Sequence, residues 1–144
     1  MTTTAAAPDF QREIPDLLQM FAAPDAAIAG HGVDPKLFHL VKLRASQINR
    51  CSFCVQMHAR EARQDGETSE RLDRLVVWDE VANFTPAEKA ALAWTEALTV
   101  LDHGRDLAPL RAELRAHFSD RQIAALTAGV ALINLWNRIG IAQH

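Results

Sequence analysis

The sequence predicts an all-α fold, a single-domain bundle of about six or seven helices. Its 144 residues suit one hydrophobic core, because a chain of this length buries roughly two-thirds of the surface that its unfolded form exposes. Strand signals are weak, since apolar and polar residues nowhere alternate over a sustained run and the β-branched residues do not cluster. Residue patterns that mark helix starts recur along the chain, and they favour the all-α class.

Proline and capping residues mark the first helices. We expect one at about Asp9–Ala22, divided or bent at Pro15 because proline lacks the amide hydrogen that a helix interior needs. Asp34 followed by Pro35 supplies a capping side chain and a favourable first helical residue. The helix that begins there is expected to end near Asn49.

The next helix carries both cysteines of the sequence. It should reach Asp65, where Gly66 suits the left-handed turn that ends many helices. A short helix over residues 69–78 is expected to follow.

Two capping boxes, each a Ser or Thr followed three residues later by Glu or Gln, begin later helices. They lie at 85–88 and 119–122. The first opens a helix that Gly104 is expected to stop, and the second opens the last helix, Asp120–Arg138. Between these two we expect a helix over residues 107–118.

The last helix is apolar over most of its circumference, so it should be buried in the core or against another subunit. Residues 1–8 are small and polar, and we expect a disordered tail or one left by cloning. Residues 9–144 should then form one domain, since neither a long linker nor a low-complexity tract divides them.

Composition excludes several function classes. Apolar residues make up 49% and charged residues 23%, as in ordinary globular domains. The net charge is −3 and the basic residues are scattered, which argues against a nucleic-acid partner. No run of consecutive apolar residues has the length of a membrane span, so we expect no membrane association and a cytoplasmic location.

The chemistry is expected in the segment Cys51-Ser-Phe-Cys54-Val-Gln-Met-His58. These three side chains fall on one helix face, because each residue turns the helix by about 100°. Only a thiolate attacks a peroxide or a disulfide, and His58, four residues after Cys54, can take its proton. Cys54 is therefore the better candidate for attack and Cys51 for resolving the sulfenic acid. The reverse remains open, because Cys51 lies nearer the helix start, where backbone donors favour a thiolate.

Two other interpretations compete. The cluster could bind zinc, but structural zinc normally needs four ligands and the sequence offers no second pair at ligand spacing. The cysteines could also be small apolar helix residues without chemistry, as buried cysteines often are.

Three segments carry a family resemblance: residues 39–58, HLVKLRASQINRCSFCVQMH; residues 84–99, which begin FTPAE and end ALAWTEALT; and residues 132–138, LINLWNR. They resemble the signature of the alkylhydroperoxidase (AhpD-like) and carboxymuconolactone decarboxylase-like superfamily. The resemblance extends over most of the chain.

The resemblance implies an all-α bundle that assembles into trimers or hexamers. It also implies an antioxidant hydroperoxide reductase that works without metal or flavin, with Cys54 as the peroxidatic thiol, Cys51 as the resolving thiol and His58 as the relay base. A thiol partner such as a lipoyl-bearing protein would restore the dithiol. The alternatives are a helical binding or assembly module with a non-catalytic dithiol and, ranked lower, a decarboxylase, an activity of members without the cysteine pair.

Two positions depart from the family pattern. The relay glutamate lies twelve positions before the first cysteine in the better-known members, and here His39 occupies that position. His39 could replace it, since imidazole titrates near neutral pH, or it could be a satisfied surface histidine. Arg50 stands where the family usually has glycine, so the turn before Cys51 should tolerate a side chain. Its cation could lower the pKa of the thiols, but we expect it to point to solvent.

A few other residues invite a role. Glu96 lies in an apolar stretch, and we expect it to pair with Arg44 or Arg138 rather than to transfer protons. Phe53 and Met57 flank the thiols and either line an apolar approach for a peroxide or simply pack. Three tryptophans are expected to anchor the core or a subunit contact: Trp78, Trp94 and Trp136. Four histidines receive no function: His31, His103, His117 and His144.

Overall fold

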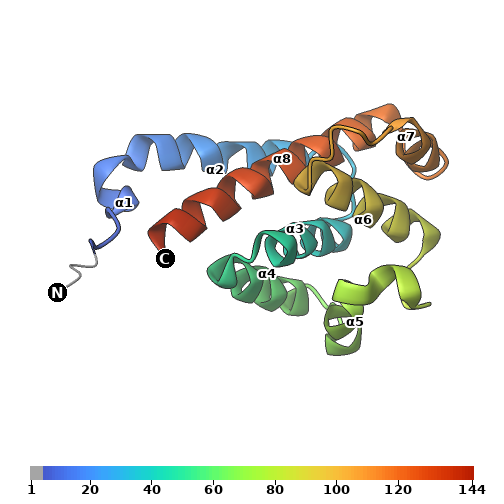
Figure 1. The fold of residues 1–144 in the computed structure, drawn as a ribbon, viewed down its shortest axis with the longest axis horizontal. Helices are drawn as coiled ribbons and strands as arrows, with labels where there is room; N and C mark the ends of the chain where they lie inside the picture. Colours follow the sequence, from blue (N-terminus) through green and yellow to red (C-terminus); the bar gives the residue numbers. More distant parts are fainter. Residues whose placement is uncertain (1–4) are drawn as a thin grey trace.

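The computed structural model describes residues 5–144, so residues 1–4 of the expected tail lie outside the described residues. Within residues 5–144 there are eight α-helices, one 3-10 helix and no strand, which confirms the all-α prediction (Figure 1). The helices are α1 Phe10–Glu13, α2 Pro15–Ala29, α3 Pro35–Asn49, α4 Ser52–Gln64, α5 Ser69–Arg74, η1 Leu75–Glu80, α6 Pro86–Thr99, α7 Ala108–Arg115 and α8 Asp120–Gln143. Their number slightly exceeds the six or seven expected, because the chain divides completely before Pro15.

Helix starts follow the sequence signals closely. The Asp34 side chain accepts a hydrogen bond from the second amide of α3 at 2.8 Å. Both capping boxes form, with Thr85 and Glu88 at the start of α6 and Ser119 and Gln122 at the start of α8. Each box satisfies two backbone donors that the first turn of a helix leaves free.

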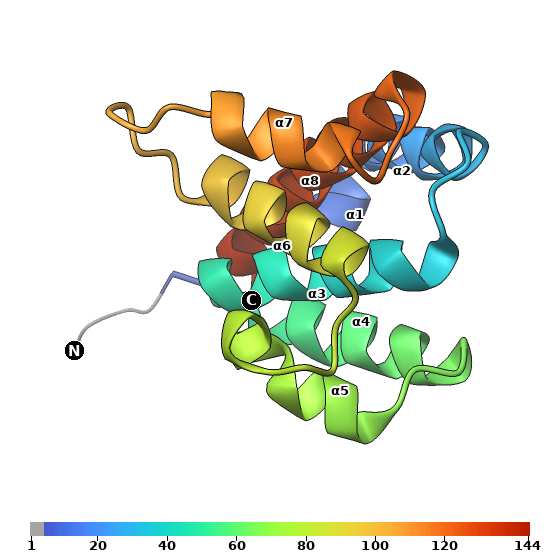
Figure 2. The same ribbon diagram turned by 90° about the vertical axis from the view of Figure 1, so that its right-hand side faces the viewer.

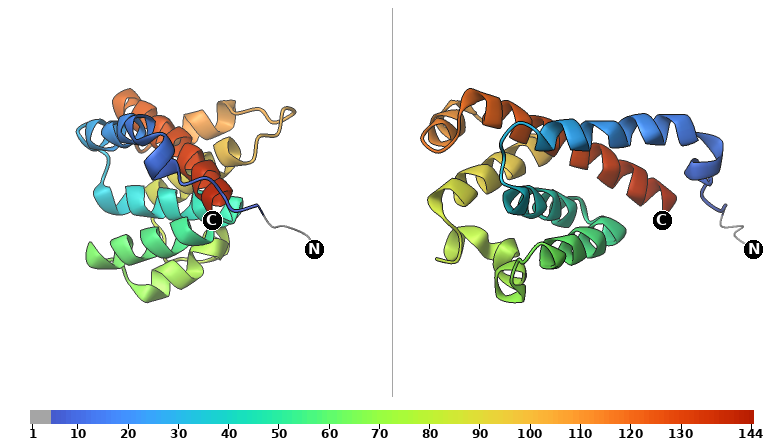
Figure 3. Two further views of the ribbon diagram at one scale, coloured as in Figure 1. Left: turned by 90° about the vertical axis from the view of Figure 1, so that its left-hand side faces the viewer. Right: turned by 180° about the vertical axis from the view of Figure 1, so that it is seen from behind.

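Helix α2 continues past the expected end at Ala22 and includes Pro24. Packing accounts for the difference, because the helix lies along α8 (Figure 3). Ile28 is buried in the core and the ring of Phe21 meets that of Trp136 edge-on at 6.3 Å. These contacts outweigh the hydrogen bond that proline forfeits.

Other helix ends also differ from expectation. Helix α6 stops at Thr99, several residues before Gly104, because Val100 is extended and the Asp102 carboxylate accepts from the Gly104 amide at 2.9 Å. Such side-chain bonds compete with helix formation. The short helix expected over 69–78 is divided into α5 and η1, since Val77 has non-helical dihedral angles.

The helices form three layers (Figure 2). Helices α2 and α7 and the first part of α8 lie on one side, α4 and α5 lie on the other, and α3 and α6 lie between them. The C-terminal part of α8 crosses to the level of α3 and contacts α4. Helix α3 contacts α4, α6 and α8 and is the centre of the core, where Leu40 and Val41 are completely buried. The cysteine pair follows directly after this central helix.

Helix α8 is the one described helix that is long and apolar enough to cross a membrane by length and composition, with a mean hydropathy of 1.2. In this fold one side of α8 packs on the core, where Leu126, Val130 and Ile133 are buried. Core helices pass the same test of length and composition.

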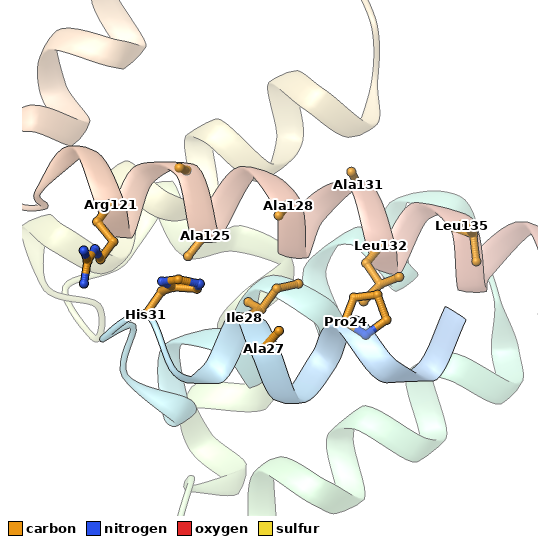
Figure 4. A pocket seen from close by; sticks show the side chains of 11 residues that line it. Pro24, Ala27, Ile28, His31, Arg121, Ala125, Ala128, Ala131, Leu132 and Leu135 are labelled. Carbon is orange, nitrogen blue, oxygen red and sulfur yellow. The ribbon is translucent and has the colours of Figure 1, made fainter. Parts of the chain in front are cut away.

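An open groove of about 600 Å³ lies between α2 and α8 (Figure 4). Its lining is mostly apolar, with Leu132 of α8 next to Pro24 of α2, while Arg121 and His31 lie at one end of the groove. Some apolar residues of the last helix thus face the core, and others line this groove.

Candidate active site

The turn between α3 and α4 places the cysteines. Arg50 adopts the left-handed conformation (φ 58°, ψ 36°) that ends α3, and the Cys51 amide donates to the Ser46 carbonyl at 3.1 Å. The expectation that this turn tolerates a side chain is confirmed, and Arg50 is exposed. The expectation that one helix carries both cysteines is met only for Cys54, because Cys51 is extended and caps α4, with its sulfur accepting from the Cys54 amide at 3.3 Å.

Cys51 and Cys54 form a disulfide, with Cα atoms 5.2 Å apart. Both are buried, at 2% and 3% exposure. The spacing therefore brings the two sulfurs together, as the sequence indicates.

Helix α8 packs on this disulfide through Gly140. A Cβ atom added at Gly140 would lie 2.9 Å from the Cys51 sulfur and 3.2 Å from the Cys54 sulfur. Only glycine allows the helix backbone to approach so closely. The sequence gives no local signal for this role, because the contact joins residues far apart in the chain.

A cavity of about 390 Å³ opens beside the disulfide. Cys54 lines it, whereas Cys51 does not. Much of its lining is apolar: Leu18, Phe38, Phe53, Met57, Ile133, Trp136 and Ile139. The polar lining includes Lys42, His58 and Glu61. Phe53 and Met57 thus line the same cavity as Cys54.

His58 is buried at the side of this cavity, with 5% exposure. Its Nδ1 lies 3.1 Å from a carboxylate oxygen of Glu61, and its Nε2 is buried with no hydrogen-bond partner. Burial lowers the pKa of His58 below the usual 6.5, and the charges of Lys42 and His39 lower it further, although the bond to Glu61 opposes them. The neutral imidazole is therefore the favoured form at neutral pH.

His39 lies elsewhere. Its Nε2 is 2.6 Å from an Asp65 carboxylate oxygen, which ties α3 to the end of α4. His39 does not line the cavity of Cys54 but a smaller one of about 130 Å³, and Lys42 borders both. A relay role for His39 stays a prediction.

Glu96 pairs as expected. Its carboxylate accepts from Arg44 at 2.8 Å and from the Trp78 indole at 2.8 Å. None of these three side chains lines the cavity of Cys54. Trp78 and Trp94 are buried as predicted, but Trp136 borders the cavity, which sequence reasoning did not foresee.

Sequence reasoning also missed Lys42, Glu61 and His144. Glu61 had a usable signal, because it follows His58 by three residues and so shares its helix face. Lys42 had none, since α3 brings it to the cavity from another element. His144 received no function, yet its ring stacks on Phe53 with centroids 4.9 Å apart and lines the cavity.

Among residues 5–144 no group of three or more His, Cys, Asp or Glu side chains is arranged to hold a metal ion.

The chain is similar to several known proteins. Residues 15–97 match the model of the carboxymuconolactone decarboxylase family. The uncharacterized protein YdfG of Bacillus subtilis is 41% identical over 104 residues, which cover 72% of this chain and 71% of YdfG. The uncharacterized protein YnjA of Escherichia coli is 33% identical over 111 residues, which cover 77% of this chain and 60% of YnjA.

Solved structures share the fold. A protein of unknown function from Agrobacterium tumefaciens, named as a candidate antioxidant defence protein AhpD, has a TM-score of 0.88 and 35% identity over 95% of this chain and 94% of its own. The debrominase Bmp8 has a TM-score of 0.81 and 19% identity over 92% of this chain and 71% of its own. At that identity the likeness shows the fold alone.

Proposed function

This chain belongs to the carboxymuconolactone decarboxylase family, and we propose that it is a thiol-dependent hydroperoxide reductase of the alkylhydroperoxidase type with an antioxidant role. One observation carries the proposal: Cys54 faces the largely apolar cavity beside a buried imidazole, whereas Cys51 lies outside its lining. A substrate in the cavity would therefore meet Cys54.

In the first step the Cys54 thiolate attacks the terminal oxygen of the hydroperoxide. The O–O bond breaks, Cys54 becomes a sulfenic acid, and the other oxygen leaves as an alkoxide that takes up a proton to give the alcohol. Neutral His58 serves as the base that removes the thiol proton and returns it to the leaving oxygen. Its lowered pKa keeps it able to accept that proton near neutral pH.

In the second step the Cys51 thiol attacks the sulfenic sulfur, which forms the disulfide and releases water. A dithiol reductant, such as a lipoyl-bearing protein, then restores both thiols and is itself oxidised to a disulfide. Attack by that reductant on the cavity-facing sulfur of Cys54 expels Cys51 as a thiolate. The backbone amide that already bonds to the Cys51 sulfur favours this leaving group.

Both electrons in this cycle come from sulfur, so no metal or flavin is required. We further propose a cytoplasmic homo-oligomer, a trimer or hexamer. The apolar groove between α2 and α8 supports such a contact (Figure 4).

Stopped-flow oxidation of the reduced protein by cumene hydroperoxide and hydrogen peroxide tests the proposal. The wild type should react far faster than a free thiol. Cys54→Ser should abolish the reaction, and Cys51→Ser should leave a sulfenic acid that dimedone traps. A wild type that reacts no faster than free cysteine would exclude the peroxidase and favour a helical module with a non-catalytic dithiol.

A further inference from the structure

His58 and Glu61 form a pair on one face of α4. Their side chains approach to 3.1 Å between Nδ1 and Oε2, and both line the cavity that Cys54 borders. The other imidazole nitrogen, Nε2, is buried without a hydrogen-bond partner. Buried polar atoms are nearly always satisfied, so an unpaired ring nitrogen at a cavity points to a partner that arrives during function.

The carboxylate decides which nitrogen of His58 carries the hydrogen. An ionised carboxylate can only accept hydrogen bonds, so Nδ1 must donate to Glu61. In a neutral imidazole Nε2 then has the free lone pair. The same logic applies wherever a carboxylate orients a working histidine through its second nitrogen.

We infer that Glu61 is a positioning residue that holds His58 in the tautomer whose Nε2 accepts the proton of Cys54. This inference rests on the proposed peroxidase function. His39 is paired with Asp65 and lies outside the lining of the cavity, so it does not orient His58 in this way.

The charged groups around His58 agree with this assignment. Lys42 and His39 of α3 act on it as positive charges, and Asp25 of α2 borders the same cavity. Glu61 is the one carboxylate among the described residues that forms a hydrogen bond with the ring. Its side chain is 38% exposed, so replacing it should leave the fold of α4 intact.

The test compares Glu61→Ala and Glu61→Gln with wild type. Nitrogen–proton correlation spectra of the imidazole report the tautomer of His58. Stopped-flow oxidation by cumene hydroperoxide reports how fast the thiol reacts. We expect the Nδ1-protonated tautomer in wild type and a shift toward the Nε2-protonated one in Glu61→Ala. The oxidation rate of that variant should fall about 10-fold, with part of the rate recovered in Glu61→Gln, whose amide oxygen can still accept.

Glu113→Gln is the matched control. Glu113 of α7 contacts His117, just after the end of that helix, at the same 3.1 Å in an exposed pair that does not line the cavity of Cys54, so this variant should keep the wild-type rate and His58 tautomer. An active wild type whose tautomer and rate are unchanged in Glu61→Ala would overturn the inference while leaving the peroxidase standing. An inactive wild type would instead refute the proposed peroxidase function, and with it the catalytic role of the His58–Glu61 pair.

Discussion

At the scale of single residues, His58 should make both activity and stability depend on pH. Burial lowers its pKa in the folded protein, so the unfolded chain binds a proton at a higher pH than the native one. The free energy of unfolding should therefore fall as the pH drops below about 6.5 and through the lower folded value. Urea denaturation of the disulfide form at pH 7.5 and pH 5.5 measures this loss. His58→Gln should reduce the dependence, and an equal slope in that variant would contradict the assignment.

The residues of the candidate site were predictable where one helix and its cap residue carry them. Cys51, Cys54 and His58 follow from their spacing, and Glu61 extends the same helix face by one more turn. Lys42 was not predictable, because only the packing of α3 against α4 brings it to the cavity. Local periodicity contains no information about which helix faces which.

At the scale of helices, starts were predictable, but only some ends were: α3 ends at Asn49 as expected, whereas α2 and α8 continue past their expected ends. A start depends on one side chain and the next few amides, as at Asp34 and Ser119. The ends of α2 and α8 depend on what these helices contact: α2 passes through Pro24 because it packs along α8, and α8 continues beyond Arg138 to lie over the disulfide. The all-α fold class was thus predictable from local signals, whereas the lengths of α2 and α8 required tertiary contacts.

The approach of α8 to the disulfide predicts the effect of Gly140→Ala. The added methyl would lie about 3 Å from both sulfurs, closer than packed atoms allow, so the end of α8 must move away. Overpacking of this kind costs roughly 1–3 kcal/mol, although alanine regains up to about 1 kcal/mol of helix propensity. Chemical denaturation of the oxidised protein should show a net loss of about 1 kcal/mol. Gly104→Ala, in a loop with ordinary contacts, is the control, and equal stability of both variants would refute the steric argument.

At the scale of the whole molecule, a network of asparagine side chains joins α3, α6 and α8. Asn49 of α3 donates to Asn134 and Asn137 of α8 at 2.9 and 3.0 Å. Asn137 donates to Ser46 of α3 at 2.9 Å, and Asn134 donates to Thr99 of α6 at 3.2 Å. The last helix therefore also buries polar side chains, although its composition is mostly apolar. These bonds fix the end of α3, from which the turn to Cys51 starts.

Replacing Asn137 should weaken the attachment of α8 to the end of α3. The residue is completely buried, and Asn137→Ala removes its bonds to Asn49 and Ser46 and leaves a cavity in their place. We expect the free energy of unfolding to fall by about 2–3 kcal/mol. Because the Ser46 carbonyl accepts from the Cys51 amide, the thiols should also become more accessible, which faster alkylation of the reduced protein would report. The exposed Gln19→Ala should change stability by less than about 0.5 kcal/mol. Unchanged stability and alkylation in Asn137→Ala would show that the network does not hold the cysteine turn.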